Sequence, residues 1–204
     1  PSLAERFKRV EAIDFSSGLL KNAKKKCADA GHDNVRFHKV NLCRKISKLP
    51  YAKVDFALCV NALLEPSLAG RLHMWDKLRA SVKRGGQMLL VVPAVESALL
   101  SYSRLVHWNL DEGVPPATAV KHEFADDDSL TPAQILRQGV IEAGGTHTKH
   151  FLKEELQAEL PRHGFEMESI EKLEYPWHTE YADPPETMQE PYPWDWVTLA
   201  AKVR

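Results

Sequence analysis

The segment of residues 9–17 constrains the fold of this chain more than any other stretch. Val10, Ala12 and Ile13 form a short apolar run that is typical of a buried strand. Asp14 follows, and the serines behind it can cap a helix, because a serine hydroxyl accepts a hydrogen bond from an unpaired amide of the first turn. A strand that ends in an acid and turns into a helix is typical of an open α/β sheet, which binds ligands at the carboxyl ends of its strands. Two roles for Asp14 stay open, which are binding ribose hydroxyls and capping the helix.

The length and composition fit one globular α/β domain. The chain has 204 residues, of which 44% are hydrophobic and 27% are charged, which are ordinary values. The net charge of −1 gives no support for a nucleic-acid-binding face, and no apolar run reaches the ~18 residues that span a bilayer. The first residues do not resemble a signal peptide. We therefore predict a cytoplasmic protein whose three cysteines are reduced packing thiols, namely Cys27, Cys43 and Cys59.

Strands alternate with helices along the first half of the chain. The predicted strands are residues 10–13, 34–40, 54–60 and 87–92, and the predicted helices are residues 3–8, 17–30 and 67–83. The third strand is apolar almost throughout, which predicts that helices cover both of its faces. This alternation predicts a mostly parallel sheet with right-handed crossovers. The helix before Gly85-Gly86 has an apolar stripe that we expect to be buried, namely Leu68, Leu72, Trp75, Leu78 and Val82.

Residues 94–149 interrupt this regularity, and we interpret them as an insertion or lid within a single domain that spans residues 1–204. The insertion contains an apolar helix over residues 95–108, an acidic stretch over residues 123–128 and a capping box at residues 131–134. The chain then predicts a helix that ends at His163-Gly164, a strand over residues 165–173, a long loop and a final strand over residues 194–203. No helix separates the last two strands, so we expect them to pair antiparallel.

The order of these segments resembles that of the class I S-adenosylmethionine-dependent methyltransferases. The matching segments are residues 10–16, 34–42, 54–63, 82–90 and 151–165, and the resemblance covers residues 3–93 and 150–203. It implies a Rossmann-like α/β sheet that is mostly parallel, with an antiparallel C-terminal strand and helices on both faces. It also implies that S-adenosyl-L-methionine is the cofactor and that its methyl group passes in line to an acceptor.

The resemblance places a cofactor site at the ends of three predicted strands. Asp14 corresponds to the acid that binds the ribose hydroxyls. Asn41 stands where the family often has an aspartate near the adenine amine, so it keeps an acceptor oxygen but loses the charge. Leu42 would pack on the adenine, and residues 61–63 would line the methionine end. The implied cofactor-binding residues are Asp14, Phe15, Ser16, Asn41, Leu42, Asn61, Ala62 and Leu63.

The glycine-rich loop of the family is absent from this sequence. It follows the first strand of the family's sheet, and it would lie before residues 3–8, which match the helix behind it. Three explanations stay open: a segment upstream of this sequence, a strand supplied by another chain through swapping, or an inactive relative. Without that central strand, its two neighbours would be left unpaired.

No fixed catalytic motif is expected, because the sulfonium methyl group is already activated. The protein must mainly hold the acceptor about 3 Å from the methyl carbon, and a general base is needed only if the nucleophile arrives protonated. The catalytic candidates lie in the insertion and are Tyr102, His107 and His150, while Tyr102, His107 and Trp108 are the candidates for substrate contacts. Each histidine, His147 included, has an alternative role as a surface or packing residue.

Aromatic residues in and after the insertion have two possible roles. They form a wall for a flat or cationic acceptor, or they cover the edge of the sheet. We predict no metal site, because the segments of residues 147–150 and 126–128 offer no third ligand at a recognisable spacing. The aromatic residues are Trp108, Trp177, Tyr181, Tyr192 and Trp194.

The sequence therefore predicts an S-adenosylmethionine-dependent methyltransferase that acts on a small-molecule acceptor. A protein acceptor and an oligomeric state are left open, and the near-neutral charge disfavours nucleic acid. One alternative is an inactive methyltransferase-like binding protein, which would not bind the cofactor. The other is an NAD-dependent oxidoreductase, because an acid after a second strand also suits a dinucleotide. Against it, the sequence shows no tyrosine–lysine or histidine arrangement of a dehydrogenase.

Overall fold

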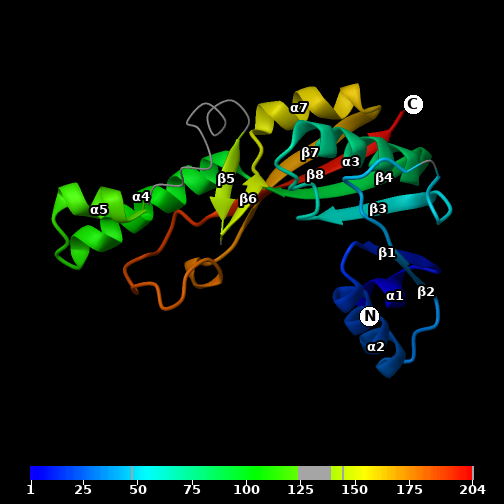
Figure 1. Ribbon diagram of the computed structural model, residues 1–204, viewed down its shortest axis with the longest axis horizontal. Helices are drawn as coiled ribbons and strands as arrows, with labels where there is room; N and C mark the ends of the chain where they lie inside the picture. The colour runs from blue at the N-terminus through cyan, green and yellow to red at the C-terminus, as the bar shows by residue number, and fades with distance from the viewer. Residues whose placement is uncertain (47, 124–138, 144, 204) are drawn as a thin grey trace.

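The computed structural model describes residues 1–46, 48–123, 139–143 and 145–203, and it shows an α/β fold whose strands form three hydrogen-bonded groups (Figure 1). The strands are β1 (Val10–Asp14), β2 (Val35–Lys39), β3 (Val54–Val60), β4 (Val82–Pro93), β5 (Val140–Ala143), β6 (Thr146–Lys149), β7 (Phe165–Glu174) and β8 (Trp194–Lys202). The helices are α1 (Ser2–Arg6), α2 (Ser17–Asp29), α3 (Leu68–Ser81), α4 (Val95–Asp111), α5 (Pro116–Glu123), α7 (Lys153–Arg162) and the 3-10 turn η1 (Trp177–Thr179).

The main sheet has the strand order β3-β4-β8-β7. β3 pairs parallel with β4, whereas β8 pairs antiparallel with both β4 and β7. Three strands therefore run in one direction and the C-terminal strand opposes them, as the sequence predicted. The register places Pro93, at the carboxyl end of β4, opposite Asp195, at the start of β8.

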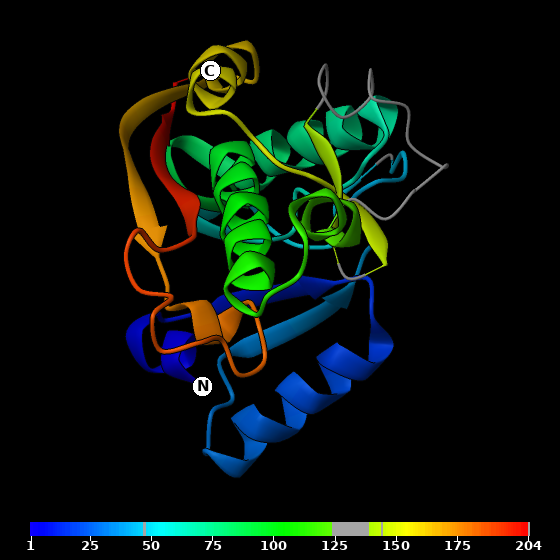
Figure 2. The same ribbon diagram turned by 90° about the vertical axis from the view of Figure 1, so that its left-hand side faces the viewer.

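A second, smaller sheet consists of β1 and β2, which pair in parallel. Together with α1 and α2 it forms a unit apart from the main sheet (Figure 2). Among the described residues β1 pairs only with β2, and β3 pairs only with β4, so each keeps one unpaired edge. A ring contact joins the two units, because Phe7 stacks on Phe56 of β3 with 5.9 Å between ring centroids.

The start of β4 differs from the prediction. We expected a helix to about residue 83 that Gly85 and Gly86 would stop, but α3 ends at Ser81 and β4 already begins at Val82. Gly85 has φ +73°, and a Cβ atom on Gly86 would lie 2.7 Å from the backbone oxygen of Asp55. The two glycines therefore permit a turn and a close approach of β4 to β3, rather than a helix stop.

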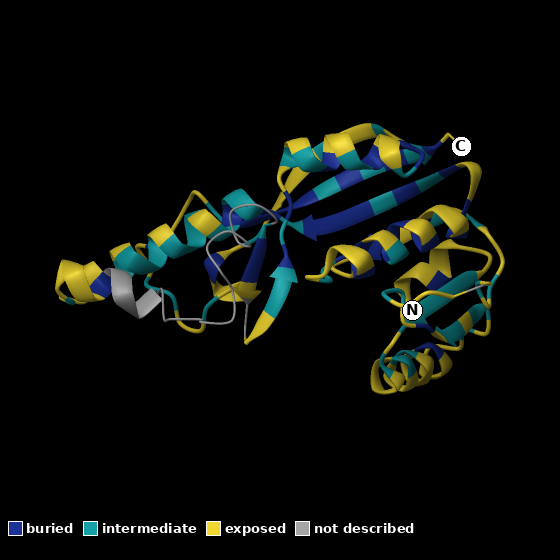
Figure 3. Ribbon diagram, turned by 45° about the horizontal axis from the view of Figure 1, so that its top comes forward, coloured by how far each residue is buried: buried dark blue, intermediate teal, exposed yellow. Residues whose placement is uncertain are grey.

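The hydrophobic core lies between the main sheet and helices α3 and α7, and buried residues gather along the strands of that sheet (Figure 3). Trp75 of α3 stacks on His163 at the end of α7, with ring centroids 4.8 Å apart, so both helices cover the same face. Of the predicted stripe, Trp75, Leu78 and Val82 are buried, whereas Leu68 and Leu72 are 58% and 44% exposed.

Two buried cations explain why the apolar stripe of α3 was partly wrong. Arg71 donates hydrogen bonds to the carbonyl oxygens of Glu65 and Pro66, at 2.9 and 2.6 Å. Lys77 Nζ donates to the carbonyl oxygen of Leu42 at 2.8 Å. These backbone acceptors satisfy the charged groups, so the buried face of α3 includes Arg71 and Lys77.

The opposite face of β3 is not covered as we predicted. Leu58 and Val60 are 43% and 51% exposed, whereas Cys59 between them is buried. Side chains alternate between the two faces of a strand, so only the face toward the core is covered by the described residues. The apolar composition of this strand indicated cover on both faces and was misleading on this point.

The described residues of the segment that we predicted as an insertion form α4, α5 and a β5–β6 hairpin that the sequence had not predicted. The hairpin leads back to the sheet, because the backbone amide of Phe151 donates to the carbonyl oxygen of Pro93 at 2.8 Å. The capping box and most of the acidic stretch, residues 124–138, lie outside the described residues. Among the described helices, none is long and apolar enough to cross a membrane.

Candidate functional site

A pocket of about 280 Å³ lies at the carboxyl end of β4. The first turns of α4, the β5–β6 hairpin, the loop after β7 and the start of β8 enclose it. The carboxyl ends of parallel strands are where open α/β sheets bind ligands. The polar and aromatic side chains that line this pocket include Tyr102, His150, Tyr175, Tyr181, Trp194 and Asp195.

Asp195 is the buried carboxylate of this pocket, with 7% of its surface exposed. Asn61 Nδ2 donates a hydrogen bond to Asp195 Oδ2 at 3.2 Å, and the Tyr175 hydroxyl donates to the same carboxylate. Burial raises the pKa of Asp195 above its ordinary value, and these two hydrogen bonds oppose the rise. Asn61 follows β3 with φ +44°, a left-handed conformation that asparagine tolerates better than most residues.

Tyr175 extends the network toward the pocket mouth. Its backbone amide donates to the carbonyl oxygen of Pro193 at 3.1 Å, which holds the end of β7 against the chain that enters β8. Burial raises the pKa of the Tyr175 hydroxyl, and the carboxylates of Asp195 and Glu180 beside it raise it further. Tyr175 therefore serves as a hydrogen-bond donor, not as a phenolate.

His150 is the predicted catalytic candidate that lies in the pocket together with Tyr102. Burial lowers the pKa of His150, which favours the neutral imidazole. Its Nδ1 lies 3.2 Å from the carbonyl oxygen of Thr148, so Nδ1 carries the proton and Nε2 keeps its lone pair. The backbone amide of His150 also donates to the carbonyl oxygen of Gly139 at 2.7 Å, which fixes the base of the hairpin.

The other acceptor-site candidates lie elsewhere. His107 is exposed and does not line the pocket. Trp108 also lies outside the lining, but its ring contacts the wall residue Tyr181 edge-on, with 6.4 Å between centroids, and its Nε1 donates to Glu112 Oε1 at 2.7 Å. Both residues stand on α4 beyond the turns that reach the pocket, because the helix continues away from the sheet (Figure 1).

Some of the aromatic residues that we predicted as an acceptor wall or as cover for the sheet edge line the pocket. Tyr181 and Trp194 line the pocket. Trp177 is 2% exposed and stacks on Tyr181 with 6.0 Å between centroids, so it supports the wall from behind. Tyr192 is held outside by a hydrogen bond from its hydroxyl to Gln189 Oε1 at 3.2 Å.

The predicted ribose-binding acid, Asp14, lies at the carboxyl end of β1 and is half-buried. Asp14 Oδ1 accepts a hydrogen bond from the Ser16 amide at 2.7 Å, and Ser16 caps α2 by accepting from the Leu19 amide at 3.3 Å. The helix-capping role therefore holds for this turn. It engages one oxygen of Asp14 and does not exclude ribose binding by the other. Phe15 is 71% exposed.

The residues expected around the adenine follow β2. Asn41 is exposed, and its Oδ1 accepts from the Cys43 amide at 2.9 Å, so the side chain stabilises its own turn. Leu42 packs partly against the hydrophobic core. At the end of β3, Asn61 and Ala62 are exposed, whereas Leu63 is fully buried in the core. Leu63 therefore packs against apolar side chains and does not face a ligand, which corrects that part of the prediction.

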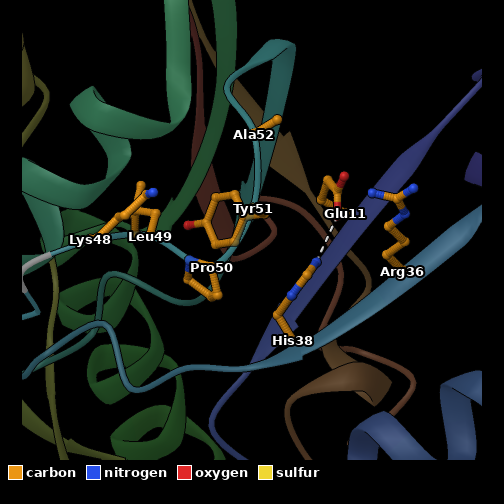
Figure 4. Close-up of a pocket in the computed structure, with 8 residues that line it drawn as sticks. All are labelled: Glu11, Arg36, His38, Lys48, Leu49, Pro50, Tyr51 and Ala52. Carbon is orange, nitrogen blue, oxygen red and sulfur yellow. Dashed lines mark hydrogen bonds and ion pairs between the residues drawn. The ribbon is translucent and has the colours of Figure 1, made fainter.

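A larger hollow of about 480 Å³ lies between the β1–β2 pair and the loop before β3 (Figure 4). Glu11 Oε2 and His38 Nε2 are 2.6 Å apart there, and Arg9 Nε lies 3.2 Å from Glu11 Oε1. Tyr51 faces His38, with 5.4 Å between ring centroids. None of the predicted cofactor residues lines this hollow.

The described residues contain no group of three or more side chains that could hold a metal ion. The predicted alternative at residues 126–128 lies outside the described part of the chain. All three cysteines are free thiols, and burial raises the pKa of Cys59 to about 12.

Comparison with known proteins finds one family model that matches part of the chain and solved structures that share its fold. Residues 1–86 match the family model described as "Methyltransferase domain". The whole chain is similar in structure to an S-adenosylmethionine-dependent methyltransferase from Methanosarcina mazei, with TM-score 0.63 and 18% identity, over 99% of this chain and 85% of that one. Residues 1–86 are therefore similar to the methyltransferase-domain family, and the chain has the fold of the S-adenosylmethionine-dependent methyltransferases.

Two further structures support the fold. The magnesium protoporphyrin IX methyltransferase from Synechocystis PCC 6803, with bound SAH, matches with TM-score 0.56 and 12% identity, over 98% of this chain and 67% of that one. A S-adenosylmethionine-dependent methyltransferase from Clostridium acetobutylicum matches with TM-score 0.56 and 11% identity, over 98% and 77% of the two chains. No curated protein matches the sequence.

The pocket contains two residues that sequence reasoning missed, Asp195 and Tyr175. Asp195 lies between Trp194 and Trp196 in a strand that otherwise reads as apolar. An acid at the start of a buried strand was the available signal, because such a group needs a hydrogen-bonding partner. Its partner is Asn61, which is 134 residues away, and the sequence alone could not show that pairing.

Proposed function

We propose that this chain acts as an S-adenosylmethionine-dependent methyltransferase on a small-molecule acceptor. The observation that carries the proposal is that the family match over residues 1–86 includes three consecutive strand ends, at Asp14, Asn41 and Asn61. The third of them is hydrogen-bonded to the wall of a pocket at the carboxyl end of β4. A cofactor site and an acceptor pocket would therefore meet at Asn61.

Each residue would contact the part of the cofactor that lies nearest to its strand end. Asp14, with one oxygen held by the Ser16 amide, would use its other oxygen to accept from the ribose hydroxyls. Asn41 would offer the second lone pair of its Oδ1 to the adenine amine. Asn61 and Ala62 are exposed at the end of β3 and would line the methionine end.

When bound, the cofactor supplies a methyl group that is already activated by its sulfonium. The protein then has to position the acceptor and exclude water. The aromatic wall of Tyr181 and Trp194 would exclude water from the pocket, and Trp177 holds Tyr181 in place. A side chain that accepts a proton is required only for a protonated nucleophile.

The test is a calorimetric titration of S-adenosylhomocysteine into the protein and its Asp14→Ala variant. Loss of a charged hydrogen-bonding partner should cost roughly 1.5–3 kcal/mol, or about 10- to 150-fold in affinity. Asp29→Ala is the matched control, because Asp29 is exposed at the end of α2, and it should bind like the original protein.

Three results would contradict the proposal. If S-adenosylhomocysteine does not bind, these 204 residues do not by themselves form the cofactor site. If NAD binds in its place, the chain is the dinucleotide-binding alternative. Equal losses in the Asp14→Ala and Asp29→Ala variants would show that Asp14 is not in the cofactor site.

A further inference from the structure

We propose that the pocket at the carboxyl end of β4 binds an amine, whose cationic group pairs with Asp195 between aromatic walls. This inference rests on the proposed function for its catalytic part, in which the amine nitrogen is the methyl acceptor. The binding part rests on the pocket alone. Together, the two parts name amines as the class of acceptor that the methyltransferase would use.

The charge of the pocket lining supports a cationic ligand. Three carboxylates line it, from Glu142, Glu180 and Asp195, and no lysine or arginine is among the described lining residues. His150 is the remaining basic residue of the lining, and its burial favours the neutral form. An anionic acceptor would therefore be repelled, whereas an ammonium group would be attracted.

Asp195 is a buried acid without a cationic partner among the described residues. Its hydrogen bonds come from the amide of Asn61 and the hydroxyl of Tyr175. Among the other buried charges, Lys149, which is 1% exposed, lies 2.6 Å from Glu155 Oε2, whereas Arg71 and Lys77 donate to backbone carbonyl oxygens. A buried charge is costly unless an opposite charge compensates it, so the position that remains beside Asp195 suits a ligand cation.

The walls of the pocket suit the same ligand. Tyr102, Tyr175, Tyr181 and Trp194 line it, and aromatic faces attract cations through their quadrupoles. Trp194 already shows this behaviour, because Lys172 Nζ lies 3.6 Å from the centroid of its ring. A volume of about 280 Å³ limits the ligand to a small molecule.

An independent observation also points to a ligand. Trp194 is 8% exposed, and its Nε1 is a buried donor with no acceptor among the described residues. Buried donors in folded proteins are nearly always paired, so an acceptor atom of a bound molecule would satisfy this group. The ligand that fits best is therefore a small amine that carries an oxygen or nitrogen acceptor or an aromatic ring.

The link to methyl transfer runs through Asn61. Its side chain holds Asp195 while its backbone ends β3, where the methionine end of the cofactor is proposed to lie. Asp195 would accept a proton from the bound ammonium and leave a neutral amine. The nitrogen lone pair then forms the N–C bond as the C–S bond breaks, and its electron pair returns to sulfur. The products are the methylammonium and S-adenosylhomocysteine, and the proton on Asp195 is released to water.

The binding test compares benzylamine with its uncharged analogue benzyl alcohol and with the anion benzoate. Tryptophan fluorescence follows the titrations, because Trp194 lines the pocket. We expect benzylamine to bind at least tenfold more tightly than benzyl alcohol, and benzoate to bind least. The Asp195→Asn variant should lose most of the preference for the amine. The Glu171→Gln variant, which changes an exposed acid, should keep it.

The outcomes separate this inference from the proposed function. Equal affinity for benzylamine and benzyl alcohol in the original protein overturns the inference, even if the Asp195→Asn variant fails to fold. If S-adenosylhomocysteine binds but benzylamine does not, the methyltransferase proposal stands and the amine class is wrong. If benzylamine binds with the expected selectivity but S-adenosylhomocysteine does not, the pocket assignment stands and the enzymatic proposal falls.

A second readout tests the catalytic part. Mass spectrometry after incubation of benzylamine with S-adenosylmethionine should detect N-methylbenzylamine, and Asp195→Asn should reduce its rate at least tenfold. Benzyl alcohol carries no ammonium group from which Asp195 could accept a proton. Methylation of benzyl alcohol at the same rate as benzylamine would therefore overturn the role of Asp195 as the proton acceptor.

Discussion

Asp195 and His150 show how single residues set the character of the pocket. Both are ionisable, Asp195 is buried and His150 is half-buried, and burial moves their pKa values in opposite directions, upward for the acid and downward for the base. The common cause is that a buried site disfavours the charged form. A hydrogen bond from the distant residue Asn61 fixes the side chain of Asp195. A hydrogen bond to the nearby carbonyl oxygen of Thr148 fixes the side chain of His150.

His150 gives a prediction for the dependence of stability on pH. Its folded pKa lies below its ordinary value of 6.5, so the unfolded chain binds a proton more readily as the pH falls through that value. The free energy of unfolding should therefore decrease between pH 7.5 and 5.5, by at most about 1.4 kcal/mol per pH unit from this group. Urea unfolding at these pH values measures it.

The controls for this prediction are two histidine variants. His150→Gln should lose this part of the pH dependence. His107→Gln should keep it, because His107 is exposed. Identical slopes in all three proteins would show that the neutral form of His150 does not contribute to stability.

At the scale of elements, the junction of α3 and β4 is the place where local sequence was least informative. Val82 is fully buried and pairs with Val54, so strand pairing takes it into β4 although helical periodicity includes it in α3. Gly86 lies so close to the Asp55 backbone that a side chain would collide there. The boundary between α3 and β4 is therefore set by the pairing of β4 with β3, which the helical pattern of the local sequence does not show.

The close approach at Gly86 predicts a loss of stability in the Gly86→Ala variant. The added methyl group would lie 2.7 Å from the Asp55 carbonyl oxygen and 3.0 Å from Val82 Cγ1, so β4 or β3 would have to shift. We expect a loss of roughly 1–3 kcal/mol in the free energy of unfolding, measured by urea denaturation. Gly18→Ala is the control, because its nearest contact would be Ser16 Oγ at 3.8 Å. Similar stabilities of the two variants would contradict the crowding at Gly86.

Most elements could be predicted because their patterns are local. The strand of residues 54–60 and the antiparallel pairing of the last two strands follow from apolar runs and from the absence of a helix between the strands. The β5–β6 hairpin was missed because His147 and Lys149 make the second strand polar. Lys149 is buried there only because Glu155 of the next helix pairs with it.

The candidate site was harder to predict than the fold. The ends of β1, β2 and β3 carried a recognisable family order, which located Asp14, Asn41 and Asn61. The pocket at the carboxyl end of β4 is assembled from elements far apart in sequence, and its acid was identified only through the hydrogen bond from Asn61. Leu63 was misassigned because the prediction used only its position after a strand, whereas its side chain packs among the residues of the hydrophobic core.

At the scale of the whole molecule, the separation into two sheets predicts a difference in local stability. No residue of β1 is buried, whereas most residues of β8 are, and ring contacts join the two units at Phe7–Phe56 and His38–Tyr51. Backbone amides of β1 and β2 should exchange with solvent at least tenfold faster than those of β4 and β8 in hydrogen-exchange mass spectrometry. Equal protection of both sheets would show that they open as one cooperative unit.

The unpaired edges of β1 and β3 also affect how a cofactor would be held. Asp14 and Asn41 belong to the unit of β1 and β2, whereas Asn61 belongs to the main sheet. A molecule bound to all three would bridge the two units, so part of its binding free energy would be spent on fixing their relative position. The measured affinity would then be lower than the contacts alone imply, by the fraction of molecules whose units are already aligned.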